Sequence, residues 1–318
     1  MRFAATLAAA ALAFLSFAAG AQTFPTKTVR IIVPYAAGGE SDTLGRLVAQ
    51  KLTEKWKQPV VVESKPGGGT VIGTEAGAKA DPDGHSMLLT SFGFVTNQVL
   101  VPNLPYDPAS LLPQVMIATA PSVLYVNPVI PARTLKELID YAKTRPKQMM
   151  FASSGNASSP HIAAELFAQL AGIEITHVPY KGTGPALTDL LGGQVHAIFG
   201  VGSLMPNVKS GKLRAITVAN ATRIIAAPDI PTTAESGLPN FTSASWWGIF
   251  VPAKVPTDLR QRIYVDIKGI LELADMRERI IAAGLEPSSM SRDEFAAFLR
   301  SELQKWGGII RARNIRLN

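Results

Sequence analysis

Short apolar runs alternate along the chain with stretches in which apolar residues recur every three or four positions. The short runs predict strands, which we place at Val29–Val33, Val60–Val62, Met87–Leu89, Met149–Ala152, Ile175–Val178, His196–Phe199 and Leu213–Val218. Helices are predicted between them, and the first has an apolar face made by Leu44, Leu47, Val48 and Leu52. Strands that alternate with helices indicate crossover connections, so we expect an α/β fold with mainly parallel sheets.

Polar residues mark the start of two of these helices. Thr134 with Glu137, and Ser291 with Glu294, have the spacing of a capping box. In that motif the hydroxyl and the carboxylate both bind free amides at the helix start. The chain after Thr257 is expected to be mainly helical, because its apolar residues keep the helical spacing.

The order of elements favours two lobes joined by two crossing segments. We predict one lobe over residues 22–122 and 229–318 and a second over residues 123–228. The crossings are expected at residues 107–121 and at residues 227–240, a stretch rich in Pro, Gly and Thr. A single continuous α/β domain is the alternative that the length of 318 residues leaves open.

The first 21 residues predict a signal peptide. Arg2 gives a positive start, residues 3–19 are almost wholly apolar, and Ala19-Gly20-Ala21 offers the small residues of a cleavage site. The apolar stretch is shorter than the roughly 20 residues of a membrane-spanning helix. We therefore expect cleavage after Ala21 and a mature protein outside the cytoplasm.

The composition excludes several kinds of chemistry. The sequence has no cysteine, which excludes disulfides, thiolate metal sites and a cysteine nucleophile, and its four histidines make a histidine-rich metal site unexpected. No cofactor is expected, because neither the P-loop pattern nor Gly-x-Gly-x-x-Gly occurs. The formal net charge of +7 suits anionic partners, and the basic residues are too scattered to indicate nucleic acid.

Three loops carry the residues of a candidate anion site. Residues 34–42, 153–161 and 177–185 each follow a predicted strand and lead into a helix. Glycines allow close backbone approach, and the free amides of a helix start attract an anion. Lys181 is the direct countercharge that these loops offer a carboxylate. Because ligands of open α/β sheets bind at the carboxyl ends of strands, we predict a carboxylate site there.

Two other functions stay open on this pattern. An extracytoplasmic hydrolase would take a serine from Ser153–Ser159 with His161 as its base, although Phe151 stands where a nucleophile elbow needs glycine. The second open function is that of a receptor that presents its closed form to a membrane sensor. The Trp246–Trp247 pair would either pack against a hinge strand or stack on an aromatic ligand.

Several short motifs make nearly the whole mature chain resemble the Bug family, the periplasmic solute receptors of tripartite tricarboxylate transporters. The motifs are Phe24-Pro25, Val33-Pro34-Tyr35 through Gly38-Gly39 to Asp42, Val62-Glu63 with Lys65-Pro66-Gly67, Asp81-Pro82-Asp83-Gly84, Ser153-Ser154-Gly155 to His161, Val178-Pro179-Tyr180-Lys181-Gly182, Gly211 to Ala215, and Pro231-Thr232 to Gly237-Leu238-Pro239. The resemblance implies a two-lobed periplasmic-binding-protein fold. Such a protein is a monomer without enzymatic activity, cofactor or metal, which closes on an aliphatic or aromatic carboxylate and delivers it to a membrane permease.

The resemblance also implies which residues contact the ligand. They are Tyr35, Gly38, Gly39, Ser41, Asp42, Ser91, Ser153, Ser154, Gly155, Ser158, His161, Tyr180, Lys181, Gly182 and Gly200. Three positions depart from the family pattern. His196 and Gly200 stand where members often have Asp, and the loss at Gly200 argues against a ligand amine. Glu40 takes the third place of a turn that is usually close to Gly-Gly-Gly, which changes the approach of a carboxylate.

Overall fold

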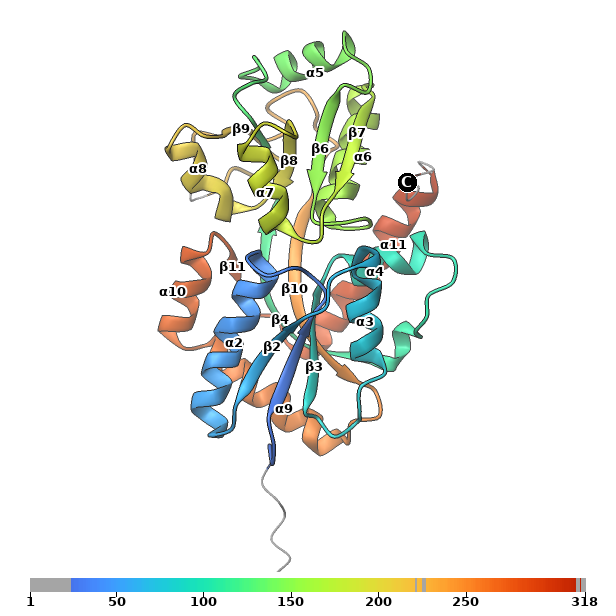
Figure 1. Ribbon diagram of the computed structural model, residues 1–318, viewed down its shortest axis with the longest axis vertical. Coiled ribbons are helices and arrows are strands. Elements are labelled where there is room, and N and C mark those ends of the chain that lie inside the picture. The colour runs from blue at the N-terminus through green and yellow to red at the C-terminus, as the bar shows by residue number, and fades with distance from the viewer. Residues whose placement is uncertain (1–23, 221, 225–226, 313–314, 316–318) are drawn as a thin grey trace, which may run out of the picture.

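The computed structural model describes residues 24–220, 222–224, 227–312 and 315, and the predicted signal peptide lies outside this part of the chain. Figure 1 shows two α/β lobes, one above the other. We call the part built on the larger sheet lobe 1 and the part built on the smaller sheet lobe 2. The predicted α/β class with two lobes is confirmed.

Lobe 1 has a mixed sheet in the order β11-β4-β10-β3-β1-β2. β1 pairs in parallel with β2 and β3, whereas β10 runs antiparallel to β3 and β4. The sheet is less parallel than expected because β10 enters it from lobe 2, in the direction opposite to β4. The strands are β1 (Val29–Val33), β2 (Val60–Ser64), β3 (Ser86–Ser91), β4 (Leu111–Pro121), β10 (Ala244–Pro252) and β11 (Glu286–Pro287).

Helices cover both faces of the lobe 1 sheet, as strand periodicity requires. Ile31 and Val33 pack with α2, α9 and α10, whereas Ile32 points to the face covered by α3, α4 and α11. Successive strand residues alternate between faces, so a run that is apolar throughout is buried on both sides. The helices are α2 (Glu40–Trp56), α3 (Val71–Ala78), α4 (Gly93–Leu100), α9 (Thr257–Leu271), α10 (Ala274–Ala282) and α11 (Arg292–Ala312).

Lobe 2 repeats this architecture with the strand order β7-β6-β8-β5-β9. β6 pairs in parallel with β7 and β8, and β5 runs antiparallel to β8 and β9. The strands are β5 (Val123–Val126), β6 (Met149–Ser153), β7 (Ile175–Pro179), β8 (Ala197–Gly200) and β9 (Arg214–Val218). The helices are α5 (Leu135–Lys143), α6 (Ser159–Ala171), α7 (Thr183–Leu191) and α8 (Met205–Lys209).

The predicted capping box at Ser291 is complete, whereas at Thr134 the Glu137 carboxylate accepts from Arg133 N in place of the Thr134 amide. The Thr134 hydroxyl accepts from Glu137 N at 3.2 Å, where α5 begins. At the start of α11, Ser291 N donates to Glu294 Oε2 at 2.7 Å and Glu294 N donates to Ser291 Oγ at 3.3 Å. These caps satisfy amides that have no partner within the helix, which is why the boundaries can be found from sequence.

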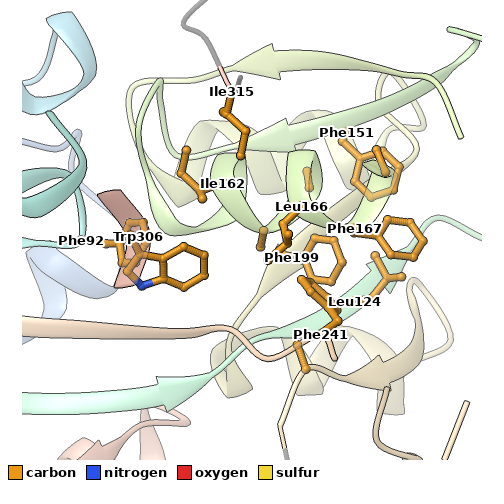
Figure 2. Close-up of a cluster of buried hydrophobic side chains, with 14 of the residues drawn as sticks. Phe92, Leu124, Phe151, Ile162, Leu166, Phe167, Phe199, Phe241, Trp306 and Ile315 are labelled. Atoms are coloured by element: carbon orange, nitrogen blue, oxygen red, sulfur yellow. The ribbon is translucent and has the colours of Figure 1, made fainter. Parts of the chain in front are cut away.

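One apolar cluster extends through both lobes on the side of α4, α6 and α11. Figure 2 shows Phe151, Phe167 and Phe199 of lobe 2 in the same cluster as Phe92 and Trp306 of lobe 1. The rings of Phe92 and Trp306 meet edge to face with centroids 5.0 Å apart. That ring contact lies within lobe 1, and the cluster as a whole buries apolar side chains of both lobes against one another.

The chain passes between the lobes where three backbone segments lie side by side. Ser122 N donates to Ser243 O at 2.9 Å, Ala219 N to Ser122 O at 2.7 Å, and Ser243 N to Ala219 O at 2.8 Å. Within residues 227–240, where the return crossing is predicted, Thr233 N donates to Val218 O at 2.9 Å. The chain returns at Ser243. The lobe boundaries at residues 122 and 228 stay a prediction.

Candidate functional site

A cavity of about 30 Å³ lies between the lobes, where α2, α6 and α7 begin. Seven of the expected ligand contacts line it, namely Tyr35, Gly39, Ser41, Ser91, Ser154, Ser158 and Gly200. The remaining lining residues are Glu40, Ser159, Pro160, Thr183, Ile198, Phe199, Val201, Ser245 and Trp247. Hydroxyl groups therefore dominate its polar surface.

On the lobe 1 side, a glycine turn leads from β1 into α2. Gly38 has φ +90°, a conformation that favours glycine, and its N–H donates to Asp42 Oδ2 at 3.2 Å. Asp42 is buried, pairs with Arg46 Nε at 2.9 Å, and does not line the cavity. Together with Glu40 it places two acidic residues in the first turn of α2. These carboxylates already complement the positive end of the helix dipole.

Neutral donors complete the lobe 1 wall. The buried Tyr35 hydroxyl is hydrogen-bonded to Ser91, and burial holds the pKa of the phenol far above its ordinary value. Trp247 Nε1 donates to Ser41 Oγ at 3.0 Å, which fixes that hydroxyl against the indole. These hydroxyl and indole groups are uncharged at neutral pH, and Glu40 is the charged residue on this side of the cavity.

On the lobe 2 side, the loop between β6 and α6 is held by its own hydroxyls. Ser153 Oγ donates to Gly155 O at 3.0 Å and accepts from Gly155 N at 3.2 Å. Ser158 Oγ donates to the same carbonyl at 2.6 Å. Gly155 has φ +133°, and a side chain there would press on Tyr180 O. The fixed loop presents Ser154 and Ser158 to the cavity, whereas Ser153 is fully buried beneath it.

Two stacked histidines support this loop from below. The rings of His161 and His177 lie 3.9 Å apart at 16°. His161 Nδ1 accepts from Ala157 N at 3.1 Å, and His177 Nε2 lies 2.6 Å from Ser153 Oγ. Burial lowers the pKa of His161 to about 3, with a further contribution from His177, and burial lowers the pKa of His177 to about 4. Both rings are neutral near pH 7.

The serine and histidine pair does not have the arrangement of a hydrolase. His161, the base expected in the hydrolase hypothesis, is fully buried and accepts a hydrogen bond from the backbone N–H of Ala157. Ser153 does contact a histidine, His177, but the serine is itself fully buried and cannot reach a substrate. A nucleophile must be exposed to the reacting carbonyl.

The loop between β7 and α7 meets the other lobe through its backbone. Ala36 N donates to the carbonyl of Lys181 at 2.5 Å, and Gly182 packs against Ala36. Gly155, Tyr180 and Lys181 line a second, larger cleft of about 530 Å³ beside Gly67–Thr70. The expected countercharge thus lies outside the lining of the hydroxyl-rich cavity. Tyr180 donates to Asp189 Oδ2 at 2.6 Å.

Four lining residues are not among the expected ligand contacts, although the sequence carries a signal for each of them. Ser159 and Thr183 belong to the first turns of α6 and α7, where free amides and hydroxyls gather. Ser245 and Trp247 are two residues apart on β10, so they share one face of the strand. Strand periodicity would have separated Trp247 from Trp246, which packs on Phe295 with centroids 5.8 Å apart.

Contacts across the cleft show that the lobes lie together in this structure. Besides the contact of Ala36 with Lys181, Ser203 Oγ of lobe 2 donates to Glu40 Oε1 at 2.6 Å. Thr96 Oγ1 of lobe 1 donates to Ala157 O in the loop of lobe 2. A ligand that binds between the lobes would enter more readily while these contacts are open.

The described residues hold no group of three or more His, Asp or Glu arranged to bind a metal ion. Across the same part of the chain, no helix combines the length and the apolar character needed to cross a bilayer. The site can bind an anion through amides and hydroxyls.

The chain is similar to known proteins in both sequence and structure. Residues 44–315 match the family model "Tripartite tricarboxylate transporter family receptor". Protein BugT of Bordetella pertussis is 34% identical over 301 residues, covering 93% of this chain and 92% of that protein. BugD, described as a periplasmic binding protein, has a TM-score of 0.86 and 29% identity, covering 92% of this chain and 99% of that one.

Two similar structures contain carboxylates. Rpa4515 of R. palustris with adipate has a TM-score of 0.88 and 31% identity, covering 92% of this chain and 99% of that one. MatC from Rhodopseudomonas palustris with bound malate has a TM-score of 0.86 and 28% identity, covering 90% and 100%. The matched family consists of receptors, so the prediction that the chain is not an enzyme is confirmed. The chain belongs to the receptor family of tripartite tricarboxylate transporters, within which it is similar to the Bug proteins.

Proposed function

We propose that the protein is a periplasmic receptor that binds a small carboxylate between its lobes and delivers it to the membrane permease of a tripartite transporter. One observation carries this proposal: three helices from both lobes begin at one cavity lined by Ser41, Ser91, Ser154, Ser158 and Thr183. The adipate and malate of two structural neighbours support a carboxylate as the ligand class.

The two lobes contribute unequally to the proposed binding of the anion. The first turns of α6 and α7 have no acidic residue, whereas that of α2 has Glu40 and Asp42. An anion is stabilised at a helix N-terminus by free amides and by the dipole, and nearby carboxylates oppose both effects. The carboxylate should therefore lie nearer to α6 and α7 than to α2.

A thermal-shift screen of mono-, di- and tricarboxylates tests this function. A ligand at 100 times its Kd adds about 2.7 kcal/mol to the stability of the folded state. We expect one class of small carboxylate to raise the unfolding temperature, and an absence of any shift across the screen would contradict the proposal.

Two variants test where the carboxylate binds. A Cβ at Gly39 would lie 3.5 Å from Thr183 N, so the branched side chain of Gly39→Val would crowd the start of α7 in the closed form. Lys181→Ala is the matched control, because its side chain lines the larger cleft. By calorimetry we expect Gly39→Val to weaken binding at least about tenfold more than Lys181→Ala. The opposite order would mean that a direct ion pair holds the ligand.

The proposed location rests on the predicted signal peptide. Mass spectrometry of protein from the periplasmic fraction should find an N-terminus at or near Gln22. A mature chain that still begins at Met1 would contradict both the cleavage and the location. Size-exclusion chromatography with light scattering should give the mass of a monomer.

A further inference from the structure

The cavity between the lobes carries a negative charge of its own. Glu40 is the charged residue in its lining, and no cation of the described chain forms an ion pair with it. The other polar lining side chains are hydroxyls and the indole of Trp247. A ligand that enters this cavity therefore lies beside a carboxylate whose partner is the hydroxyl of Ser203 and not a cation.

Glu40 is held in place at the wall between two cavities. Glu40 lines both the hydroxyl-rich cavity and an adjoining cavity of about 250 Å³. The lining of the adjoining cavity also includes Ser203 and Ala283. Ser203 Oγ donates to Glu40 Oε1 at 2.6 Å, which fixes the carboxylate when the lobes are together. Burial raises the pKa of the Tyr125 phenol, and the negative charge of Glu40 raises it further. The charge of Glu40 thus reaches groups buried in lobe 2.

We propose that Glu40 is a specificity-determining residue, which selects ligands with one carboxylate over ligands that carry a second carboxylate toward the start of α2. This inference rests on the proposed carboxylate-binding function and narrows its ligand class. Two like charges in a partly desolvated site disfavour each other, because one must be protonated or displaced. A hydroxyl at the same place would donate to Glu40 and be accepted.

The ligand class follows from the placement of donors. The first turns of α6 and α7, which have no acidic residue, favour the single carboxylate. The opposite end of the ligand then lies toward Glu40, where a hydroxyl or an apolar group fits and an anion does not. The protein selects monocarboxylates and hydroxymonocarboxylates.

Calorimetry on two pairs of acids of equal chain length tests the proposal. The pairs are adipate with hexanoate, and malate with 3-hydroxybutyrate. We expect the wild-type protein to bind the mono-acid of each pair more tightly. Glu40→Gln keeps the size of the side chain and removes its charge, and it should shift the ratio of Kd values toward the di-acid by at least about tenfold.

Ser203→Ala is the matched control for the contact across the cleft. It removes the hydrogen bond to Glu40 and keeps the charge, so it should weaken both members of a pair alike and leave their ratio unchanged. The proposal is overturned if Glu40→Gln leaves the ratio as it is, or if Ser203→Ala shifts the ratio as much. If neither the wild type nor Glu40→Gln binds any of the four acids, or a wider carboxylate screen, the carboxylate function itself fails. Circular dichroism confirms that each variant is folded.

Discussion

His161 and His177 show how buried residues outside the cavity fix the groups that line it. His161 accepts the N–H of Ala157, which has φ +62°, a conformation that residues other than glycine seldom adopt. The next residue, Ser158, lines the cavity. A protonated His161 cannot accept this hydrogen bond, because both of its ring nitrogens would then be donors.

Acid should therefore destabilise the protein through these histidines. Their folded pKa values of about 3 and about 4 lie below the unfolded value of about 6.5, so their contribution to stability is present above pH 6.5 and is lost as pH falls toward 4. At pH 5.5 the unfolded chain binds the protons and the folded one does not. Each histidine then costs about 1.4 kcal/mol relative to pH 7.5.

Urea unfolding of wild type and of a His161→Asn, His177→Gln double variant checks this prediction. The double variant replaces both rings by amides that can accept hydrogen bonds but do not titrate. Its free energy of unfolding should fall less between pH 7.5 and pH 5.5 than that of wild type. Equal falls in both proteins would assign the acid sensitivity to other groups.

At the scale of elements, β10 joins the core and the cavity through alternate side chains. Trp247 reaches the cavity and donates to Ser41, whereas Trp246 packs on the opposite face against Phe295 and Phe298. A strand within the lobe 1 sheet thus gives one of its faces to the cavity between the lobes.

Intrinsic fluorescence should separate the two tryptophans of β10. Ligand binding changes the surroundings of Trp247 and leaves those of Trp246 alone. We expect the ligand-dependent change in emission to be lost in Trp247→Phe and kept in Trp246→Phe. If Trp246→Phe abolished the signal instead, the register of β10 relative to the cavity would be wrong.

The sequence predicts what depends on neighbours along the chain. The capped helix starts at Thr134 and Ser291 and the strands around β1 and β6 agree with the structure. It does not predict the place of β10, because strand pairing joins residues far apart, such as Trp247 with Ser91. For the same reason the sequence does not show that the Lys181 carbonyl meets Ala36, or that this residue lines a cleft other than the hydroxyl-rich cavity.

At the scale of the whole molecule, the backbones of the two lobes come into close contact at two glycines, Gly202 and Gly284. A Cβ at Gly202 of lobe 2 would lie 2.5 Å from Gly284 O of lobe 1, and a Cβ at Gly284 would lie 2.2 Å from Gly202 C. Real Cβ atoms do not come so close to backbone atoms, so the contact requires glycine on both sides of the cleft.

Ligand should favour the form in which this contact exists. Small-angle scattering is expected to show a smaller radius of gyration when the tightest carboxylate of the screen is added, because the ligand shifts the population toward closed lobes. Curves that coincide at saturation would mean that the empty protein is already closed.

Gly202→Ala should oppose closure without unfolding either lobe. Its Cβ clashes only with the other lobe, so we expect at least about tenfold weaker binding and less compaction, with little change in unfolding temperature. Gly269→Ala is the matched control, because its Cβ would meet open space on α9. If Gly202→Ala binds and compacts like the control, this contact does not limit closure.

The antiparallel pairing of β10 with β3 and β4 also sets an order for folding. β4 ends at Pro121 and β10 begins at Ala244, so all of lobe 2 is synthesised between two strands that must lie side by side. All strands of lobe 2 lie within residues 123–218. The lobe 1 sheet, in contrast, lacks the strand between β4 and β3 until β10 has been synthesised. Closing so long a loop costs more chain entropy than local pairing does. The later lobe in the sequence should therefore fold first, and lobe 1 should then assemble around a partner that is already formed.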